Sequence, residues 1–219
     1  METIEADGPP VLPSWIRGRP CLSLTREFFD VRAADDRVLR RIPLCGGEEV
    51  TDALQSAKLA LPGWAGLPEE ERSGLLSAWG EALREYAGHF AKLLAEESKR
   101  EVGQTHAEVM NAASALCETP KDAELGGLVC GIHPDEKAPL FSIACLIALT
   151  LRAGGVVVAV PCCNAPGATY ALLELSGRVG LPGGVANLVQ GTEAANAALN
   201  EQAVANIFLE EPPVSLRRH

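Results

Sequence analysis

Positive charge and aromatic side chains are both scarce in this sequence of 219 residues. Phe, Trp and Tyr make up 5% of the chain, and 29 acidic residues outnumber 19 basic ones, which gives a formal net charge of -10. The Lys and Arg residues are scattered singly or in pairs, so we expect no surface that neutralises a run of phosphates. Nucleic acid is therefore not expected as a partner, and the acidic surface mainly favours solubility.

The sequence also lacks the cysteine spacing of a disulfide framework or a zinc site. It has seven cysteines, an odd number without paired C-x-x-C spacing, which is typical of reduced thiols in a cytoplasmic protein. Cys162 and Cys163 are adjacent, which suits neither zinc ligation nor thioredoxin-type chemistry, so we favour packing over a redox role. No metal site is predicted, and the expected localisation is cytoplasmic.

The sequence has neither the pattern of a signal peptide nor that of a membrane span. Residues 1–20 are acidic and carry four prolines, so we expect an extended, mobile leader rather than a secretion signal. Residues 139–160 have only Arg152 as a charged residue and are long enough to resemble a membrane helix. However, Gly154 and Gly155 break that run, which favours a buried helix followed by a buried strand and excludes a membrane partner.

Apolar runs of two kinds alternate through the second half of the chain. Helical runs are predicted at 139–153 and 166–179, and β-branched or apolar strands at 127–132, 156–160, 185–189 and 204–209. Right-handed crossovers between such strands require a parallel sheet covered by helices on both faces. The predicted fold class is α/β, a Rossmann-like three-layer sandwich. Any doubly wound domain would fit this periodicity. Since that fold has many functions, the periodicity alone does not indicate one.

The first half of the chain predicts a short hairpin and then helices. The hairpin strands are expected at 22–31 and 38–44, and the helices at 50–61, 68–100 and 101–117. The expected domains are a leader at 1–20, one α/β domain at 21–209 and an irregular tail at 210–219.

An ordered set of motifs lies between residues 139 and 191. Pro139-Leu140 opens the first helix, the strand at 156–160 ends at Pro161, and 180–191 reads GLPGGVANLVQG. This arrangement resembles the cofactor-binding part of the aldehyde dehydrogenase superfamily over about residues 25–208. The resemblance implies a truncated cofactor domain preceded by a hairpin and helices, and, for the family, NAD(P)-dependent oxidation of aldehydes.

The polar groups that contact the cofactor in that family are missing at the matching positions. His133 and Pro134 stand at a turn that lacks the family's oxyanion-binding Asn, and Asp135 and Glu136 follow it. The family's Lys-Pro-Ser-Glu is replaced by Val160, Pro161, Cys162 and Cys163, and its Gly-x-Gly by Gly191, Thr192 and Glu193. We regard seven of these positions as vestigial cofactor positions: His133, Pro134, Val160, Pro161, Cys163, Gly191 and Glu193.

The resemblance predicts two further losses. After Phe208, residues 209–213 include two carboxylates and two prolines where the family has a phosphate-binding Phe-Thr-Gly-Ser turn, and negative charge there would repel a pyrophosphate. The family's nucleophilic Cys and general-base Glu lie downstream of that turn, and none of the seven cysteines takes the matching position. No catalytic residue is therefore predicted, and His89 and His106 are expected to be solvated helix residues.

Two functional hypotheses remain open. The first is a non-catalytic aldehyde-dehydrogenase-like module, a pseudoenzyme or fragment, that acts through protein contacts and needs no cofactor. The departures at 134–136 and 160–163 make the chain similar to the degenerate second domain of the two-domain type 16 aldehyde dehydrogenases. The alternative is the N-terminal part of an NAD- or NADP-dependent enzyme whose catalytic half comes from another chain. The family's oligomerisation strands are missing, and we expect self-association or another aldehyde-dehydrogenase-like domain to cover the edge strand at 204–209.

Overall fold

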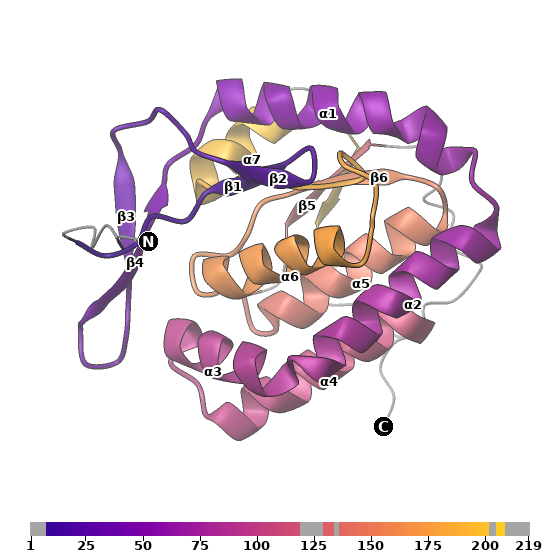
Figure 1. The fold of residues 1–219 in the computed structure, drawn as a ribbon. Coiled ribbons are helices and arrows are strands. Elements are labelled where there is room, and N and C mark those ends of the chain that lie inside the picture. The colour runs from indigo at the N-terminus through magenta and orange to yellow at the C-terminus, as the bar shows by residue number, and fades with distance from the viewer. Residues whose placement is uncertain (1–7, 119–128, 134–135, 202–204, 209–219) are drawn as a thin grey trace, which may run out of the picture.

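The molecule consists of stacked layers of helices around one main sheet. The structure, a computed structural model, describes residues 8–118, 129–133, 136–201 and 205–208. Helices α1 (Gly47–Ala65) and α7 (Thr192–Glu201) cover one face of the sheet, and α5 (Pro139–Arg152) and α6 (Pro166–Arg178) cover the other (Figure 1). The tail predicted at 210–219 falls outside the described residues.

The main sheet has the strand order β2-β1-β7-β6-β5-β8. Its strands are β1 (Ser14–Ile16), β2 (Arg19–Cys21), β5 (Val129–His133), β6 (Val156–Ala159), β7 (Ala186–Leu188) and β8 (Ala205–Phe208). The four strands from the second half of the chain pair in parallel, whereas β1 pairs antiparallel with both β2 and β7. The parallel α/β prediction is therefore confirmed, with an antiparallel hairpin added at one edge.

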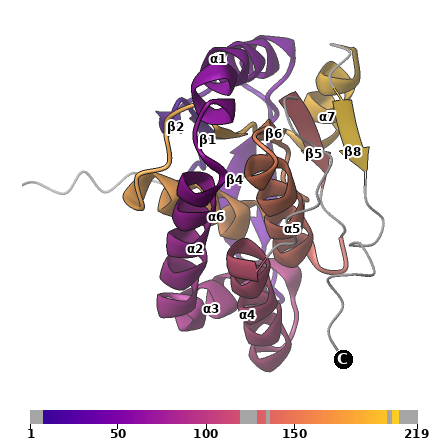
Figure 2. The same cartoon turned by 90° about the vertical axis from the view of Figure 1, so that its right-hand side faces the viewer.

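A further layer of helices packs beyond α5. It consists of α2 (Glu69–Glu85), α3 (Ala87–Ser98) and α4 (Val102–Glu118). Helix α4 packs on α5, α3 packs on α6, and α2 contacts both α5 and α6; Figure 2 shows α3 and α4 below α6 and α5. This layer explains why α5 is apolar on nearly every face, since one side meets the sheet and the other meets α4. The predicted α/β fold with helices on both faces of the sheet is confirmed, and the helices predicted in the first half of the chain, α2 to α4, form an additional layer.

The elements between 139 and 189 match the predictions to within about two residues. Helix α5 stops at Gly154, whose φ of +86° is a left-handed conformation, and the Gly155 N–H donates back to the carbonyl of Thr150 at 2.9 Å. Every residue of the β-branched strand β6 is buried. Residues 139–160 are therefore a helix and a strand, and no helix in the described part of the chain is long and apolar enough to span a membrane.

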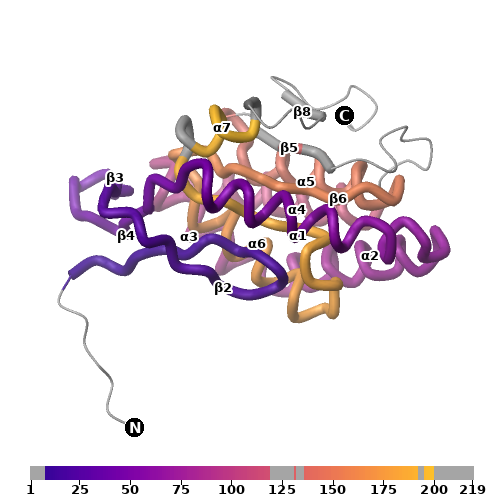
Figure 3. Tube along the Cα trace, turned by 90° about the horizontal axis from the view of Figure 1, so that it is seen from above, coloured from indigo at the N-terminus to yellow at the C-terminus, as the bar shows by residue number. Residues whose placement is uncertain are grey.

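The prediction of a mobile leader at 1–20 was wrong for its second half. Residues 14–21 form a hairpin whose turn, Arg17 and Gly18, has positive φ at both positions, as a two-residue hairpin turn requires. Trp15 and Ile16 are buried, and Trp15 pairs with Leu188 of β7. Figure 3 shows this hairpin lying alongside the rest of the sheet, whereas residues 1–7 are outside the described part.

Helix boundaries in the first half also differ from the predictions. Helix α1 does not end near Pro62 but continues through it to Ala65, because the Trp64 ring is buried and its Nε1–H donates to the Leu151 carbonyl at 2.9 Å. The helix predicted at 68–100 is two helices that break at Tyr86, where φ is -95° and ψ is 12°. The third helix, α4, is confirmed.

The predicted N-terminal hairpin is present as a separate two-stranded sheet. Its strands are β3 (Phe28–Arg32) and β4 (Val38–Pro43), and Phe28 lies opposite Pro43. The first strand begins at residue 28 rather than at 22. In Figure 1 this hairpin lies beside the layered body, and β4 is joined to the body by an ion pair that forms part of the site described below.

Lys99 closes α3 in a conformation that favours glycine. It is exposed and has a φ of +57°, a left-handed cap that disfavours any residue with a Cβ. We expect Lys99→Gly to raise the free energy of unfolding by about 1 kcal/mol, measured by urea denaturation. Lys92→Gly, in the exposed interior of the same helix, is the control and should lower it by about 1 kcal/mol. A loss of stability in both variants would contradict the prediction.

Candidate functional site

The carboxyl ends of the parallel strands meet at one edge of the sheet. Ile132 of β5 pairs with Ala159 of β6, and Ala159 pairs with Leu188 of β7. The predicted positions His133, Val160 and Gly191 follow these residues directly or closely, so their backbones share this edge. Ligands of open α/β sheets bind outside the carboxyl ends of the strands. This edge is therefore the candidate site, although Pro134 lies outside the described residues.

The segment after β6 offers mostly apolar groups to the edge. Val160 is 1% exposed and Pro161 is buried, whereas Cys162 is half-buried and Cys163 is exposed. A turn closes the segment, in which the Ala165 N–H donates to the Cys162 carbonyl at 3.2 Å. The segment has neither an ammonium nor a carboxylate, the two groups best suited to hold a pair of sugar hydroxyls.

The end of β7 is held by the N-terminal segment. The backbone N–H of Gln190 donates to Ser14 Oγ at 3.1 Å. Gly191 has a φ of +124°, and a Cβ there would lie 2.5 Å from the Cys45 carbonyl oxygen, so only glycine fits. Glu193 lies in the first turn of α7. Gly191 is therefore explained by its close approach to residue 45, without any ligand.

A buried carboxylate occupies the N-terminus of α6. Glu97, near the end of α3, accepts hydrogen bonds from the N–H groups of Gly167 at 2.9 Å and Ala168 at 3.0 Å. Its side chain is fully buried and pairs with Arg40 of β4 at 3.1 Å. A Cβ on Gly167 would lie 2.0 Å from the Arg40 guanidinium, so the first turn of α6 carries a glycine, the one residue that leaves room for this pair. Glu97 thus joins α3, α6 and the β3–β4 hairpin.

A second carboxylate occupies the N-terminus of α5 in the same way. Glu108 of α4 accepts hydrogen bonds from the N–H groups of Leu140 at 2.9 Å and Phe141 at 3.3 Å. Arg100 pairs with its other oxygen, and the Glu108 side chain is 4% exposed. The first free N–H groups of a helix are where an α/β protein most readily holds a phosphate. In this chain, internal carboxylates take that place on both α5 and α6.

The two buried cysteines in the described part are poor nucleophiles. Burial raises the pKa of the Cys45 and Cys145 thiols, that of Cys145 to about 12, so both stay protonated at neutral pH. Within the described residues, no three His, Cys, Asp or Glu side chains lie close enough to form a metal site. His89 and His106 lie on α3 and α4, as predicted.

Glu97, Glu108 and Arg40 were missed by the sequence reasoning, although two of them carry a signal. Glu97 follows Phe90 and Leu94 at helical spacing, and both of these are buried, so it continues the apolar face of its helix. Glu108 likewise shares a face with the buried Thr105 and Ala112. A carboxylate on a buried helix face needs a partner, and that need was the available clue.

A parallel sheet with helices on both faces and an open carboxyl edge is the architecture of doubly wound α/β domains, a class that includes dinucleotide-binding domains. Residues 23–125 match the aldehyde dehydrogenase family. The resemblance to that family is therefore confirmed over those residues.

Known relatives agree with this family. Glutarate-semialdehyde dehydrogenase of Pseudomonas putida is 28% identical over 179 residues, which are 73% of this chain and 37% of that protein. The NADP(+) succinate-semialdehyde dehydrogenase GabD of Escherichia coli is 27% identical over 190 residues, which are 77% of this chain and 39% of that enzyme. A solved lactaldehyde dehydrogenase superposes with a TM-score of 0.80 at 28% identity, covering 88% of this chain and 45% of the enzyme. The chain thus spans less than half the length of each.

The buried Glu97 makes stability depend on pH. Burial raises its pKa to about 7 from 4.5, despite the opposing effect of Arg40 and the α6 N–H groups. Because the folded pKa is above the unfolded value, the stabilising contribution is fully present below pH 4.5 and is lost as pH rises through 7. We expect the free energy of unfolding to fall by about 2 kcal/mol between about pH 5.5 and pH 8 from this group. Urea denaturation of the wild type and of Glu97→Gln measures it, and equal slopes in both would contradict the assignment.

Proposed function

We propose that this region is a non-catalytic aldehyde-dehydrogenase-like module that does not bind NAD or NADP. The observation that carries the proposal is the composition of the carboxyl edge. Its ribose-facing segment is Val160 to Cys163, without a Lys or a Glu, and the N-termini of α5 and α6 are filled by Glu108 and Glu97. The residues present therefore do not fit the cofactor.

Electrostatics support the same conclusion by elimination. The N–H groups of α5 and α6 already hold carboxylates and are not free to bind a phosphate. The resemblance places the pyrophosphate at the segment after Phe208, which lies outside the described residues and whose sequence adds Glu210 and Glu211. Two phosphates would be repelled by two neighbouring carboxylates, which makes pyrophosphate binding there unfavourable. Unpaired ribose hydroxyls would add about 1 to 3 kcal/mol each.

The relatives favour one alternative function. They are dehydrogenases by name, and the Escherichia coli enzyme is described as NADP(+)-dependent. Under this reading, the chain is the N-terminal part of an NAD(P)-dependent aldehyde oxidoreductase and another polypeptide supplies the catalytic half. One measurement distinguishes the two functions. If the alternative is right, mixing the chain with the catalytic part of a relative should give aldehyde-dependent production of NADH or NADPH. A rate no higher than that of the catalytic part alone would remove the alternative.

A partner domain is part of the proposal. Strand β8 is at one end of the sheet order, and among the described strands only β5 pairs with it. An edge strand with unpaired backbone groups is a template for pairing with another chain. We propose that a second copy, or another aldehyde-dehydrogenase-like domain such as that of a type 16 enzyme, covers this edge. Light scattering tests self-association of the purified chain, and a monodisperse monomer with a cooperative melt at high temperature would show that the edge is covered in another way.

Ligand-induced stabilisation tests directly whether the chain binds NAD or NADP. A ligand at 100 times its dissociation constant raises the free energy of unfolding by about 2.7 kcal/mol. We expect NAD and NADP at millimolar concentration to leave the melting temperature unchanged. GabD of Escherichia coli, measured in parallel, is the positive control. A rise in melting temperature that saturates with cofactor would contradict the proposal.

A further inference from the structure

A cavity of about 320 Å³ lies between the first turn of α3 and the second half of α6. Its lining residues are Tyr86, His89, Phe90, Ala171, Glu174, Leu175 and Arg178. This size is at the lower end of the range for small-molecule pockets. Arg178 is 11 residues from Gly167 at the other end of α6, a separation of about 16 Å along the helix axis. The cavity is therefore distinct from the carboxyl edge of the sheet.

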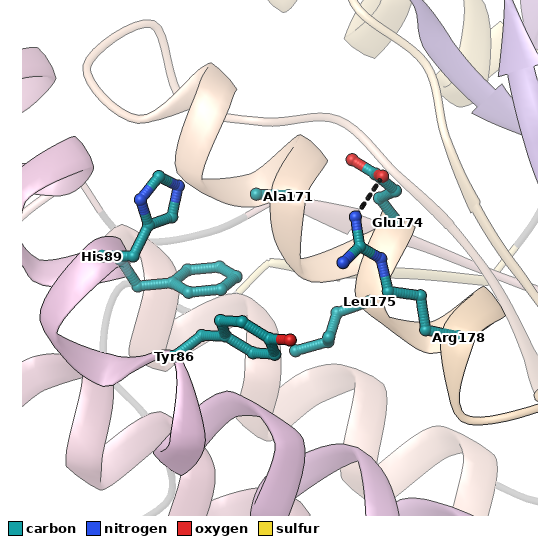
Figure 4. Close-up of a pocket in the computed structure, with 7 residues that line it drawn as sticks. Tyr86, His89, Ala171, Glu174, Leu175 and Arg178 are labelled. Carbon is teal, nitrogen blue, oxygen red and sulfur yellow. Dashed lines mark hydrogen bonds and ion pairs between the residues drawn. The ribbon is translucent and has the colours of Figure 1, made fainter.

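One side of the cavity is aromatic. The rings of His89 and Phe90 meet edge to face with their centroids 6.3 Å apart. Figure 4 shows Tyr86 extending across the opening toward Leu175, with Ala171 on the opposite wall. Tyr86 is 43% exposed, so its ring is accessible to solvent at the cavity. An aromatic and aliphatic enclosure of this kind accommodates a flat or branched apolar group.

Opposite charges stand together at the rim. Glu174 and Arg178 are one helical turn apart on α6 and are joined by an ion pair of 2.9 Å (Figure 4). Their side chains are 40% and 62% exposed, so both keep donors and acceptors available to solvent. Hydrogen bonding to Glu174 raises the pKa of Arg178. One carboxylate and one guanidinium therefore face the same apolar enclosure.

We propose that this cavity binds a small zwitterion with an apolar side group, the chemical class of an aromatic or branched α-amino acid. The ammonium group of the ligand would meet Glu174, its carboxylate would meet Arg178, and its side group would fill the space between Tyr86 and Leu175. A ligand with a single charge would meet one complementary and one like charge at the rim. A zwitterion satisfies both, because each end replaces one half of the existing ion pair. The site does not depend on the proposed loss of cofactor binding.

The test is a ligand titration of the full chain followed by nuclear magnetic resonance. The probes are L-phenylalanine, phenylacetate, which lacks the ammonium, and 2-phenylethylamine, which lacks the carboxylate. We expect L-phenylalanine to bind with a dissociation constant on the order of 1 mM, as a ligand of a dozen heavy atoms allows. Each single-charge analogue should bind about 10-fold more weakly.

Three variants assign the charges. Arg178→Gln should weaken L-phenylalanine about 10-fold and leave 2-phenylethylamine unchanged or tighter, and Glu174→Gln should do the converse with phenylacetate. Both residues are on the surface, so the fold should be retained. Glu81→Gln removes a comparable ion pair with Arg84 on α2, away from the cavity, and should have no effect. No saturable binding below about 20 mM, or equal affinities in all variants, would overturn the proposal.

Discussion

Replacing Glu97 with alanine is expected to lower the free energy of unfolding by about 3 to 5 kcal/mol at neutral pH. The substitution leaves the Arg40 guanidinium, which is 14% exposed, without its partner, and it leaves the N–H groups at Gly167 and Ala168 without their acceptor. Removing one half of a buried pair costs far more than the pair itself contributes, because the other half stays buried and unpaired. Chemical denaturation monitored by circular dichroism measures the loss.

The neighbouring residue supplies the control for this variant. Glu96 carries the same side chain at the adjacent position of α3 but is exposed, so Glu96→Ala should change stability by no more than about 0.5 kcal/mol. A double variant without both Glu97 and Arg40 should be less destabilised than the sum of the two single variants. If the losses were additive, or if Glu96→Ala matched Glu97→Ala, the three-way link between α3, α6 and β4 would be wrong.

Gly80→Ala is expected to cost about 2 to 3 kcal/mol, because α2 and α4 approach each other closely at this residue. A Cβ at residue 80 would lie 2.4 Å from Cys117 Sγ and 2.6 Å from the Ala113 carbonyl oxygen. The sulfur can move, but the carbonyl belongs to the backbone of α4, so the two helices would have to separate. This cost outweighs the gain of about 1 kcal/mol that alanine brings to a helix interior.

Gly74 on the same helix isolates the packing effect. It is exposed, and nothing lies within 4 Å of the position of its Cβ. Gly74→Ala should therefore raise the melting temperature, whereas Gly80→Ala should lower it. Cys117→Ala should restore part of the loss in a Gly80→Ala background. Stabilisation by both substitutions would show that α2 and α4 are not packed at this distance.

The elements from α5 to β7 could be predicted because their signals are local. The β-branched run before Ala159, the pair Gly154 and Gly155, and the proline at residue 166 each define a boundary without reference to the rest of the chain. The β1–β2 hairpin was missed because its strands have three residues each and lie within a proline-rich segment. The hairpin is held to the sheet by contacts with residues far along the chain, among them the pairing of Trp15 with Leu188. Such contacts leave no periodic pattern in the sequence.

The site could be predicted in part for a similar reason. The loss of polar groups at Val160 and Cys163 was visible in the sequence because the aldehyde dehydrogenase motif fixes which positions to compare. The filling of two helix N-termini was not visible, since helical periodicity says that Glu97 faces the core but not which helix end it meets. The break at Tyr86 was missed because the apolar pattern of α2 continues into α3.

The absence of cofactor binding is the central claim of this account, and calorimetric titration of the purified chain with NAD and NADP tests it most directly. We expect no heat of binding beyond dilution for either nucleotide up to about 1 mM, because the carboxyl edge offers apolar groups near the ribose and carboxylates near the phosphates. GabD titrated under the same conditions is the positive control for nucleotide binding. A saturable isotherm with a micromolar dissociation constant for either nucleotide would contradict the account.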